Sequence, residues 1–364
     1  MEPHHSSGSS SIVTLEELGG WAGVLGPLTS GHDLTSAQAG AALTEILDGA
    51  ASPAQIAAFM IGLRMKGETV EEMTGLLSTL LAFAEPVPLP AGLDIVDTCG
   101  TGGDRSHTIN VSTIAALVVA GAGAPVCKHG NRAASSACGS ADVLEALGVA
   151  IDLGPEGVAH CVTQAGMGFC FAPRFHAAMR HAGPTRRELG VPTVFNFLGP
   201  MANPARVRRQ VLGVSDPAMG EKMIAVLQAN GAERALVVYG HDGLDELTVT
   251  TTSTVLELRD GSVRTYAVDP VALGLELADV GALRGGDAAA NALFARRVLD
   301  GEKGPHRDIV LLNAAAGLVA AGIADGLADG LAAARAAVDD GRAAAVLTRL
   351  VEASQHEAAQ SPTA

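Results

Sequence analysis

The chain has 364 residues, of which 48% are hydrophobic and 3% aromatic, so it can bury a large core built mainly from Ala, Val and Leu. Its formal net charge of -15 argues against a nucleic-acid surface, which needs clustered Lys and Arg, but it permits a local site for a small anion. Five cysteines without a CxxC pair indicate reduced thiols in a cytosolic protein, not disulfides or a zinc site. We also find no apolar run that predicts a membrane span.

The first part of the chain predicts helices only. Residues 1–11 are polar and lack an apolar stretch, which predicts a disordered tail and not a signal peptide. Within 12–85, three helix starts have a capping residue followed three positions later by Gln or Glu, at Thr35, Ser52 and Thr69. The helices are short, so we expect their apolar faces to pack on the rest of the chain or on a second copy.

A proline-rich linker at 84–92 separates these helices from a region of alternating strands and helices. Helices are predicted between short apolar runs that suit strands buried on both faces. This order predicts an α/β domain with a mainly parallel sheet over 92–350, ending in a polar tail at 351–364. The expected strands are 94–97, 124–128, 148–153, 168–172, 210–214 and 235–240, with a hairpin at 254–268 that turns at Asp260-Gly261.

The stretch "DTCGTGGDRSHTINVST" (97–113) follows the first of these strands and leads into a predicted helix. Its glycines allow backbone N–H groups to approach phosphate oxygens, and the helix N-terminus favours an anion. The stretch does not match the GxGxxG pattern, however, because Arg105 occupies the position of the last glycine. The pattern GxxxxGK[ST] does not occur in the chain. From this stretch alone, two interpretations remain open: a phosphate-binding loop, or a plain turn with helix caps.

A second polar loop, "KHGNRAASSACGSAD" (128–142), follows the next strand, so a parallel sheet would place it beside the first. Lys128 and Arg132 supply cations and Ser135, Ser136 and Ser140 supply hydroxyls, a set that suits a sugar phosphate. The alternative is a polar connection that caps the following helix. Two donor-rich loops after neighbouring strands favour a ligand site.

Two further segments carry charges at chemically useful places. Asp245 and Glu246 follow the strand 235–240 and are either a solvated turn or oxygen ligands for Mg²⁺ shared with substrate phosphates. The basic segment 171–204 could bind a carboxylate through an arginine fork. Its histidines, His176 and His181, fit polar packing better than a role as general base.

Taken together, the motifs "DTCGTGGD", "NVST", "KHGNRAASSACGSADVLEALG", "PTRRELGVPTVFNFLGP" and "GLDELT" resemble the anthranilate phosphoribosyltransferase family over about residues 15–350. The resemblance implies a small helical domain, completed by part of 176–200, and a large α/β domain of the nucleoside phosphorylase/phosphoribosyltransferase type. It also implies a homodimer joined through the helical part. The implied reaction joins anthranilate to 5-phosphoribosyl-1-pyrophosphate (PRPP) with Mg²⁺, one or two ions per subunit, and releases pyrophosphate.

The resemblance also assigns residues by position in this sequence. Magnesium would be held by Ser112, Asp245 and Glu246, and anthranilate by Gly100, Asn131 and Arg186, with Lys128, Asn131 and Arg186 as the catalytic set. PRPP would contact Gly100, Gly103, Asp104, Thr108, Asn110, Val111, Ser112, Thr113, Lys128, His129, Gly130, Asn131, Arg132, Ala133, Ala134, Ser135, Ser136 and Ser140.

Three alternatives remain at this stage. A pyrimidine nucleoside phosphorylase shares the expected architecture but would need neither the acidic pair nor the basic segment. The other type of phosphoribosyltransferase carries two adjacent acids in its PRPP loop, whereas Asp94 and Asp97 are separated here. A non-enzymatic relative that binds nucleic acid or a metabolite conflicts with the net charge of -15. We further expect that His129 shapes its loop without transferring a proton.

Overall fold

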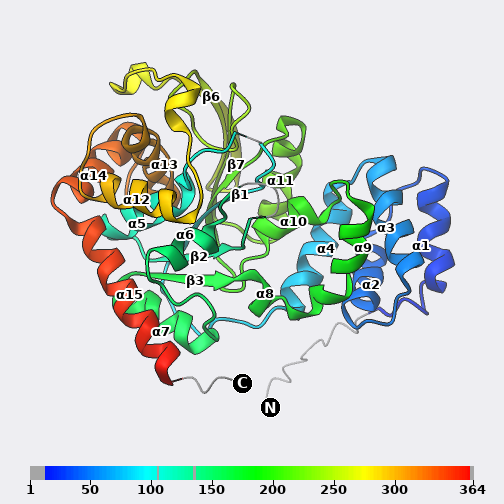
Figure 1. Cartoon of the computed structure of the whole chain (residues 1–364). Helices are drawn as coiled ribbons and strands as arrows, with labels where there is room; N and C mark the ends of the chain where they lie inside the picture. The colour runs from blue at the N-terminus through cyan, green and yellow to red at the C-terminus, as the bar shows by residue number, and fades with distance from the viewer. Residues whose placement is uncertain (1–12, 105, 134–136, 361–364) are drawn as a thin grey trace, which may run out of the picture. The chain divides into compact units, whose positions relative to one another are not determined.

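A computed structural model of the chain describes residues 13–104, 106–133 and 137–360 (Figure 1). Its backbone contacts divide it into two compact units. The first unit comprises the described residues up to Thr79 together with Ala178–Val194, and the second comprises Leu80–Ala177 and the described residues from Phe195 onward. No helix in the described ranges is both long and apolar enough to cross a membrane.

The first unit is helical, and local capping explains where its helices begin. The side chain of Thr35 accepts a hydrogen bond from Gln38 N at 3.2 Å while Gln38 Oε1 accepts one from Thr35 N at 2.9 Å, and Ser52 and Gln55 repeat this arrangement. Thr69 and Glu72 form the same reciprocal pair, at 2.8 and 3.2 Å, so all three predicted helix starts are confirmed. The helices are α1 (Gly20–Thr29), α2 (Ser36–Leu47), α3 (Pro53–Lys66), α4 (Val70–Phe83), which passes into the second unit at Leu80, and α9 (Gly183–Leu189).

The second unit contains a seven-stranded sheet in the order β3-β2-β1-β4-β5-β6-β7. The first five strands run parallel, and β6 and β7 are antiparallel, as the predicted fold class requires. The Asp260-Gly261 turn has φ values of 51° and 75°, which confirms the predicted hairpin. The strands are β1 (Val96–Gly100), β2 (Val126–Gly130), β3 (Met167–Phe171), β4 (Arg209–Gly213), β5 (Arg234–Gly240), β6 (Ser253–Arg259) and β7 (Ser262–Val268).

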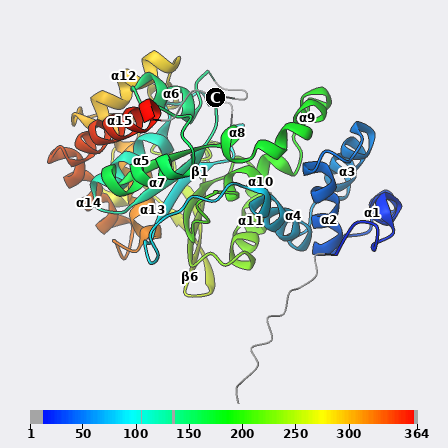
Figure 2. The same ribbon diagram turned by 90° about the horizontal axis from the view of Figure 1, so that it is seen from below.

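Helices pack against this sheet and bury its apolar residues. Both views show α5 with the C-terminal helices α12 to α14 on one side of the strands and α11 on the other (Figures 1 and 2). The core is built from Val, Ala, Leu and Ile, as the low aromatic content predicts. The helices are α5 (Val111–Gly121), α6 (Ser140–Ala146), α7 (Pro155–Ala165), α8 (Ala172–Phe175), α10 (Phe195–Met201), α11 (Pro217–Ala229), α12 (Ala288–Leu299), α13 (Pro305–Ala321), α14 (Leu327–Asp339) and α15 (Arg342–Gln360).

Two predictions about elements are wrong. The segment 148–153 is not a strand but an irregular connection between α6 and α7. Its alternating buried residues still face the core, but Ala150 N donates to Ser354 Oγ on α15 at 3.0 Å, so a helix side chain satisfies an amide that a strand would pair with its neighbour. The polar tail also begins later than predicted, because α15 continues to Gln360. The predicted tail at 1–11 and residues 361–364 lie outside the described residues.

Candidate active site

The glycines that end β1, β2, β4 and β5 open one end of the parallel sheet. Gly100, Gly130, Gly213 and Gly240 are the last residues of these four strands. In open α/β sheets, ligands bind beyond the carboxyl ends of the strands. The polar segments that the sequence singles out follow β1, β2 and β5, and the structure brings parts of all three into contact.

Lys128, Ser112 and Glu246 form a chain of contacts at this end of the sheet. Lys128, which is 1% exposed, extends from β2 and its Nζ lies 3.4 Å from Ser112 Oγ at the start of α5. The same Nζ also donates to Thr98 O on β1. The backbone N–H of Ser112 donates to Glu246 Oε1 at 3.2 Å. Residues from β2, from the start of α5 and from the segment after β5 therefore meet at one place.

Asp245 lies against the glycine loop that follows β1. Its Oδ2 accepts a hydrogen bond from Gly102 N at 2.7 Å. A Cβ atom at Gly100 would stand 2.4 Å from the same carboxylate oxygen, so no larger residue fits there while the carboxylate stays in place. Gly103 has φ 83°, a left-handed conformation that glycine adopts without strain. The glycines thus allow the loop and the acidic segment to approach each other closely.

The electrostatics of this cluster suit a divalent cation. Burial, followed by the charge of Asp104, raises the pKa of Asp245. Burial and the charge of Asp245 raise the pKa of Glu246 well above its ordinary value, although Lys128 acts in the opposite direction. These groups would be stabilised in the ionised form by a cation, and carboxylate and hydroxyl oxygens are ligands that Mg²⁺ accepts. The donor set therefore fits the predicted ion.

The described residues do not form a complete metal site by themselves. Within 13–104, 106–133 and 137–360, no group of three or more His, Cys, Asp or Glu side chains is placed to hold a metal ion. Magnesium commonly keeps several waters and shares its remaining ligands with substrate phosphates, so a site of two carboxylates and one hydroxyl is compatible with it. The geometry agrees with a metal that binds together with a phosphorylated ligand.

The start of α5 contributes backbone more than side chains. Val111 and Thr113 are buried, so their side chains are covered by the surrounding protein. The Asn110 side chain is held by the protein, because its Nδ2 donates to Cys138 O at 3.1 Å and its Oδ1 accepts from Asn291 at 2.9 Å. Thr108 forms an isolated bridge with Arg284. The helix start is therefore anchored from both sides.

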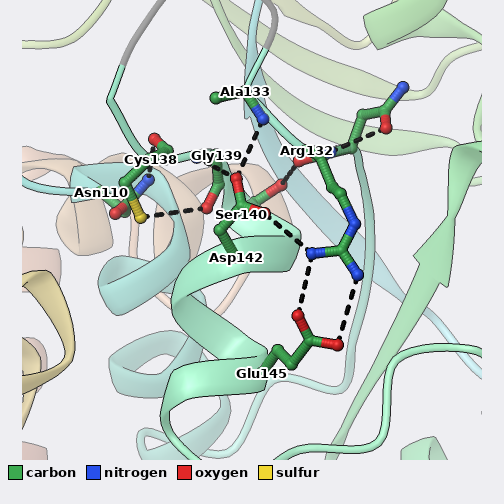
Figure 3. Close-up of polar contacts among 9 residues, drawn as sticks. Asn110, Arg132, Ala133, Cys138, Gly139, Ser140, Asp142 and Glu145 are labelled. Carbon is green, nitrogen blue, oxygen red and sulfur yellow. Dashed lines mark hydrogen bonds and ion pairs between the residues drawn. The ribbon is translucent and has the colours of Figure 1, made fainter. Parts of the chain in front are cut away.

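The loop after β2 is shaped by α6 (Figure 3). One carboxylate oxygen of Asp142 accepts hydrogen bonds from Ala133 N at 3.0 Å and Gly139 N at 2.8 Å. Asn131 O accepts from Ser140 Oγ at 3.2 Å. The predicted residues Ala134, Ser135 and Ser136 lie outside the described residues. Asp142 thus closes the loop at its base.

Arg132, like Asn110, is a predicted PRPP contact whose side chain is engaged by the protein. Its Nη1 lies 2.9 Å from Asp142 Oδ1 and 2.8 Å from Glu145 Oε2, and Nη2 lies 3.2 Å from Glu145 Oε1. Figure 3 shows the guanidinium directed along α6 toward Glu145. In this arrangement the fork is occupied by two carboxylates, so the side chain is not presented to a phosphate.

His129 is buried beside a second histidine. Its ring centroid lies 5.1 Å from that of His176, and burial together with His176 lowers the pKa of His129 to about 3. The ring is therefore neutral near pH 7. This state agrees with our expectation that His129 shapes the loop and does not act as a general base.

The remaining predicted contacts are distributed over both units. Asn131 and Gly130 lie in the second unit, where a Cβ at Gly130 would stand 2.2 Å from Ser140 Oγ. Arg186 lies in the first unit, on α9, where burial lowers the pKa of its guanidinium. Our sequence reasoning missed Asp97, Asp142 and Asn203 as members of the site framework. Only Asp142 had a local signal, since a carboxylate three residues after a glycine suits a helix start.

Comparisons with known proteins bear on this site. Residues 92–344 match the glycosyl transferase family a/b domain, and residues 23–84 match the helical bundle domain of the same family. Anthranilate phosphoribosyltransferase of Acidothermus cellulolyticus is 58% identical over 341 residues, which cover 92% of this chain and 95% of the relative. The enzyme of Chloroflexus aggregans is 52% identical, covering 90% and 96%.

Solved structures agree in fold as well as in sequence. The crystal structure of anthranilate phosphoribosyltransferase from Thermus thermophilus has a TM-score of 0.86 and 42% identity, covering 91% of this chain and 99% of its own. The Saccharomyces cerevisiae enzyme in complex with PRPP and Mg has a TM-score of 0.84 and 26% identity, covering 92% and 98%. Together with the matched domains and the meeting of the three loops, these likenesses establish that the chain belongs to the anthranilate phosphoribosyltransferase family.

Proposed function

We propose that the chain transfers the 5-phosphoribosyl group of PRPP to the amino group of anthranilate, a step of tryptophan biosynthesis. The new bond joins the amine nitrogen to C1 of the ribose, the bond from C1 to pyrophosphate breaks, and the amine loses one proton. The observation that carries this proposal is the contact chain from Lys128 through Ser112 to Glu246, beside the Gly100–Gly103 loop. It gathers a cation, backbone donors and acids at one end of the sheet.

PRPP would be held by backbone as much as by charge. The glycine loop and the start of α5 offer N–H groups to phosphate oxygens, in the manner of other anion sites at helix N-termini. Lys128 would lie beside the departing pyrophosphate, where a fixed cation stabilises charge that develops in the transition state. Because Lys128 is 1% exposed and already held by Thr98 O, it is oriented before substrate arrives.

Asp245, Glu246 and Ser112 would hold magnesium, one or two ions per subunit. When bound there, Mg²⁺ supplies charge neutralisation for the pyrophosphate group. The complex of the yeast relative with PRPP and Mg supports this use of the metal. The protein's own part is to collect the acids: Gly102 N orients Asp245 and Ser112 N orients Glu246.

Anthranilate would bind at Gly100, Asn131 and Arg186, with the guanidinium of Arg186 facing its carboxylate. An aromatic amine is already neutral near pH 7, so the reaction needs no strong base. Most of the rate would then come from positioning the two substrates and from stabilising charge. The neutral, buried ring of His129 agrees with such a mechanism.

The test is an anthranilate fluorescence-depletion assay with and without PRPP and Mg²⁺. We expect depletion only when both are present. Arg186→Ala should weaken anthranilate binding while PRPP binding is kept, and Arg187→Ala, on the same helix, is its matched control. Turnover of thymidine with phosphate, without depletion of anthranilate, would instead identify a pyrimidine nucleoside phosphorylase and contradict the proposal.

Further properties of the family resemblance extend this proposal. We propose that residues 12–85, with part of 176–200, act as the helical domain, that residues 92–350 act as the phosphoribosyltransferase domain, and that two copies form a homodimer through the helical part. We also propose a cytoplasmic location, supported by five free cysteines in the described residues. Sedimentation of the purified chain tests the dimer, with a monomer at micromolar concentration as the contrary result.

A further inference from the structure

The strands β1 and β2 separate soon after they begin to pair. Within the described residues 96–100 and 126–130, Val96 and Val126 are the only residues that pair between the two strands. On its other side, each strand pairs along its whole length, β1 with β4 and β2 with β3. Beyond Val96 and Val126, the facing backbone groups of β1 and β2 must therefore find partners other than each other.

Side chains take the place of the missing strand pairing. Asp97 Oδ1 on β1 accepts a hydrogen bond from His129 N on β2 at 3.3 Å. Asn203 Nδ2 donates to Cys127 O on β2 at 2.8 Å and also to Asp97 Oδ2 at 2.8 Å. On the opposite strand, Thr98 O accepts from Lys128 Nζ. The peptide groups on both sides of Lys128 are thus held by Asp97 and Asn203.

This pair is rigid and hidden from water. Asp97 is 0% and Asn203 1% exposed. The orientation of the Asn203 amide is fixed by its surroundings, because Oδ1 accepts from Ala205 N at 2.9 Å while Nδ2 faces two acceptors. A reversed amide would lose all three bonds, so the network selects this orientation of the amide.

The segment that carries Asn203 is itself anchored to the sheet. It follows α10, and Pro200 O accepts from Gln210 Nε2 on β4 at 2.8 Å. Ala202 O lies 2.8 Å from His176 Nε2 in the residue that follows α8. The position of Asn203 is therefore fixed from two sides, and through it so is the backbone of β2 next to Lys128.

We propose that Asp97 and Asn203 are positioning residues that hold β2 apart from β1 and thereby set Lys128 and residues 131–133 for PRPP. Neither residue needs to touch substrate. Direct strand pairing in this stretch would bring the β2 backbone toward β1 and shift Lys128 from its place beside Ser112 and Thr98 O. The kinetic part of this inference rests on the proposed function, but the structural part does not.

The first test is Asn203→Leu, which keeps the approximate side-chain volume but removes the donors to Cys127 O and Asp97. We expect kcat to fall on the order of 10²-fold, since a misplacement of about 1 Å can have that effect. Hydrogen exchange at the amide of His129, read without any substrate, should become faster. Val226→Ala on α11, a buried site in the same unit, is the matched control: it should lower Tm while leaving kcat unchanged.

The second test exchanges the two residues in the double variant Asp97→Asn, Asn203→Asp. A bond between the two side chains is restored, but Cys127 O now faces a carboxylate in place of a donor. Positioning predicts that Tm recovers relative to Asn203→Leu while kcat stays low. A merely structural role predicts that kcat recovers together with Tm, and that result would overturn the proposal.

The substrate-free measurement separates this inference from the proposed function. Suppose that hydrogen exchange at His129 is faster in Asn203→Leu, but that the wild-type chain does not consume anthranilate. These results would support the positioning pair and reject the proposed function. If instead the wild-type chain is active and Asn203→Leu changes neither the exchange at His129 nor kcat, the positioning pair is rejected and the proposed function is kept.

Discussion

In the helical unit, the buried carboxylate of Glu72 is surrounded by donors. Leu34 N and Thr69 N each donate to it at 2.8 Å, and Lys66 Nζ donates at 3.0 Å. In the α/β unit, the carboxylates of Asp245 and Glu246 gather beside Asp104; Gly102 N donates to Asp245 at 2.7 Å and Ser112 N donates to Glu246 at 3.2 Å. The first arrangement is complete, whereas the second collects more negative charge than its donors balance.

This difference distinguishes a structural acid from a ligand-binding one. Although burial acts to lower it, the pKa of Lys66 is raised by its hydrogen bonds to Asp33 and Glu72, so this cluster is internally compensated. Burial and neighbouring acids instead raise the pKa of both Asp245 and Glu246. A cluster that is unfavourable on its own is expected where a bound ligand completes it.

Lys128→Met should produce the largest effect. It removes the cation beside the acidic cluster while keeping an apolar stem of similar length. We expect kcat/KM for PRPP to fall on the order of 10²–10³-fold, as for other preorganised groups that stabilise developing charge. Initial rates of anthranilate depletion measure this, with the exposed Lys303→Met as control. Retained activity in Lys128→Met would mean that the cluster serves only the fold.

Glu72→Gln tests the structural side of the comparison. The variant breaks a buried ion pair and leaves Lys66 without one of its partners, so we expect the free energy of unfolding to fall by about 3–5 kcal/mol. Urea denaturation measures the change. Glu71→Gln, whose exposed side chain accepts a hydrogen bond from Ser36 N on α2 at 3.1 Å, should change it by about 1 kcal/mol or less. Equal effects of the two variants would remove the distinction between a completed buried acid and a surface one.

Glu246→Gln tests the other side through pH. The pKa of Glu246 is raised above 4.5 in the folded chain, so the folded state holds a proton that the unfolded state releases, and stability falls as pH rises above that value. In EDTA at about pH 8, the variant should therefore melt a few degrees above the wild type. With PRPP and Mg²⁺ it should be less active than the wild type, but more active than Lys128→Met. A lower Tm at this pH would show that the carboxylate stabilises the fold.

The sequence predicted what local chemistry decides. The capping boxes at Thr35 and Ser52 need only neighbours three residues away, and both formed. The strand expected at 148–153 did not, because its alternating pattern is equally satisfied by helices that pack from distant parts of the chain. The alternation of strands and helices predicted a mainly parallel sheet. The position of each motif directly after a strand predicted that the three loops meet at one end of it.

Long-range polar pairs were beyond the sequence. Asp97 and Asn203 are separated by 106 positions, and no periodicity connects them. Asp97 stood out only as an acid in an apolar strand, and Asn203 only as part of a turn-rich segment. Arg132 illustrates the opposite failure: its charge and place suggested a phosphate contact, but Asp142 and Glu145, one helical turn apart on α6, already engage it.

Arg132→Ala should therefore have the smallest effect. The exposed ion pairs that it loses contribute about 1 kcal/mol or less to stability, and we expect kcat/KM for PRPP to change by less than about threefold. Arg208→Ala, which breaks another exposed pair, with Glu233, is the matched control. A selective loss of PRPP affinity in Arg132→Ala, steep in salt, would mean that substrate draws the guanidinium away from α6. The loop after β2 would then belong, like the acidic cluster, to the part of the molecule that a ligand completes.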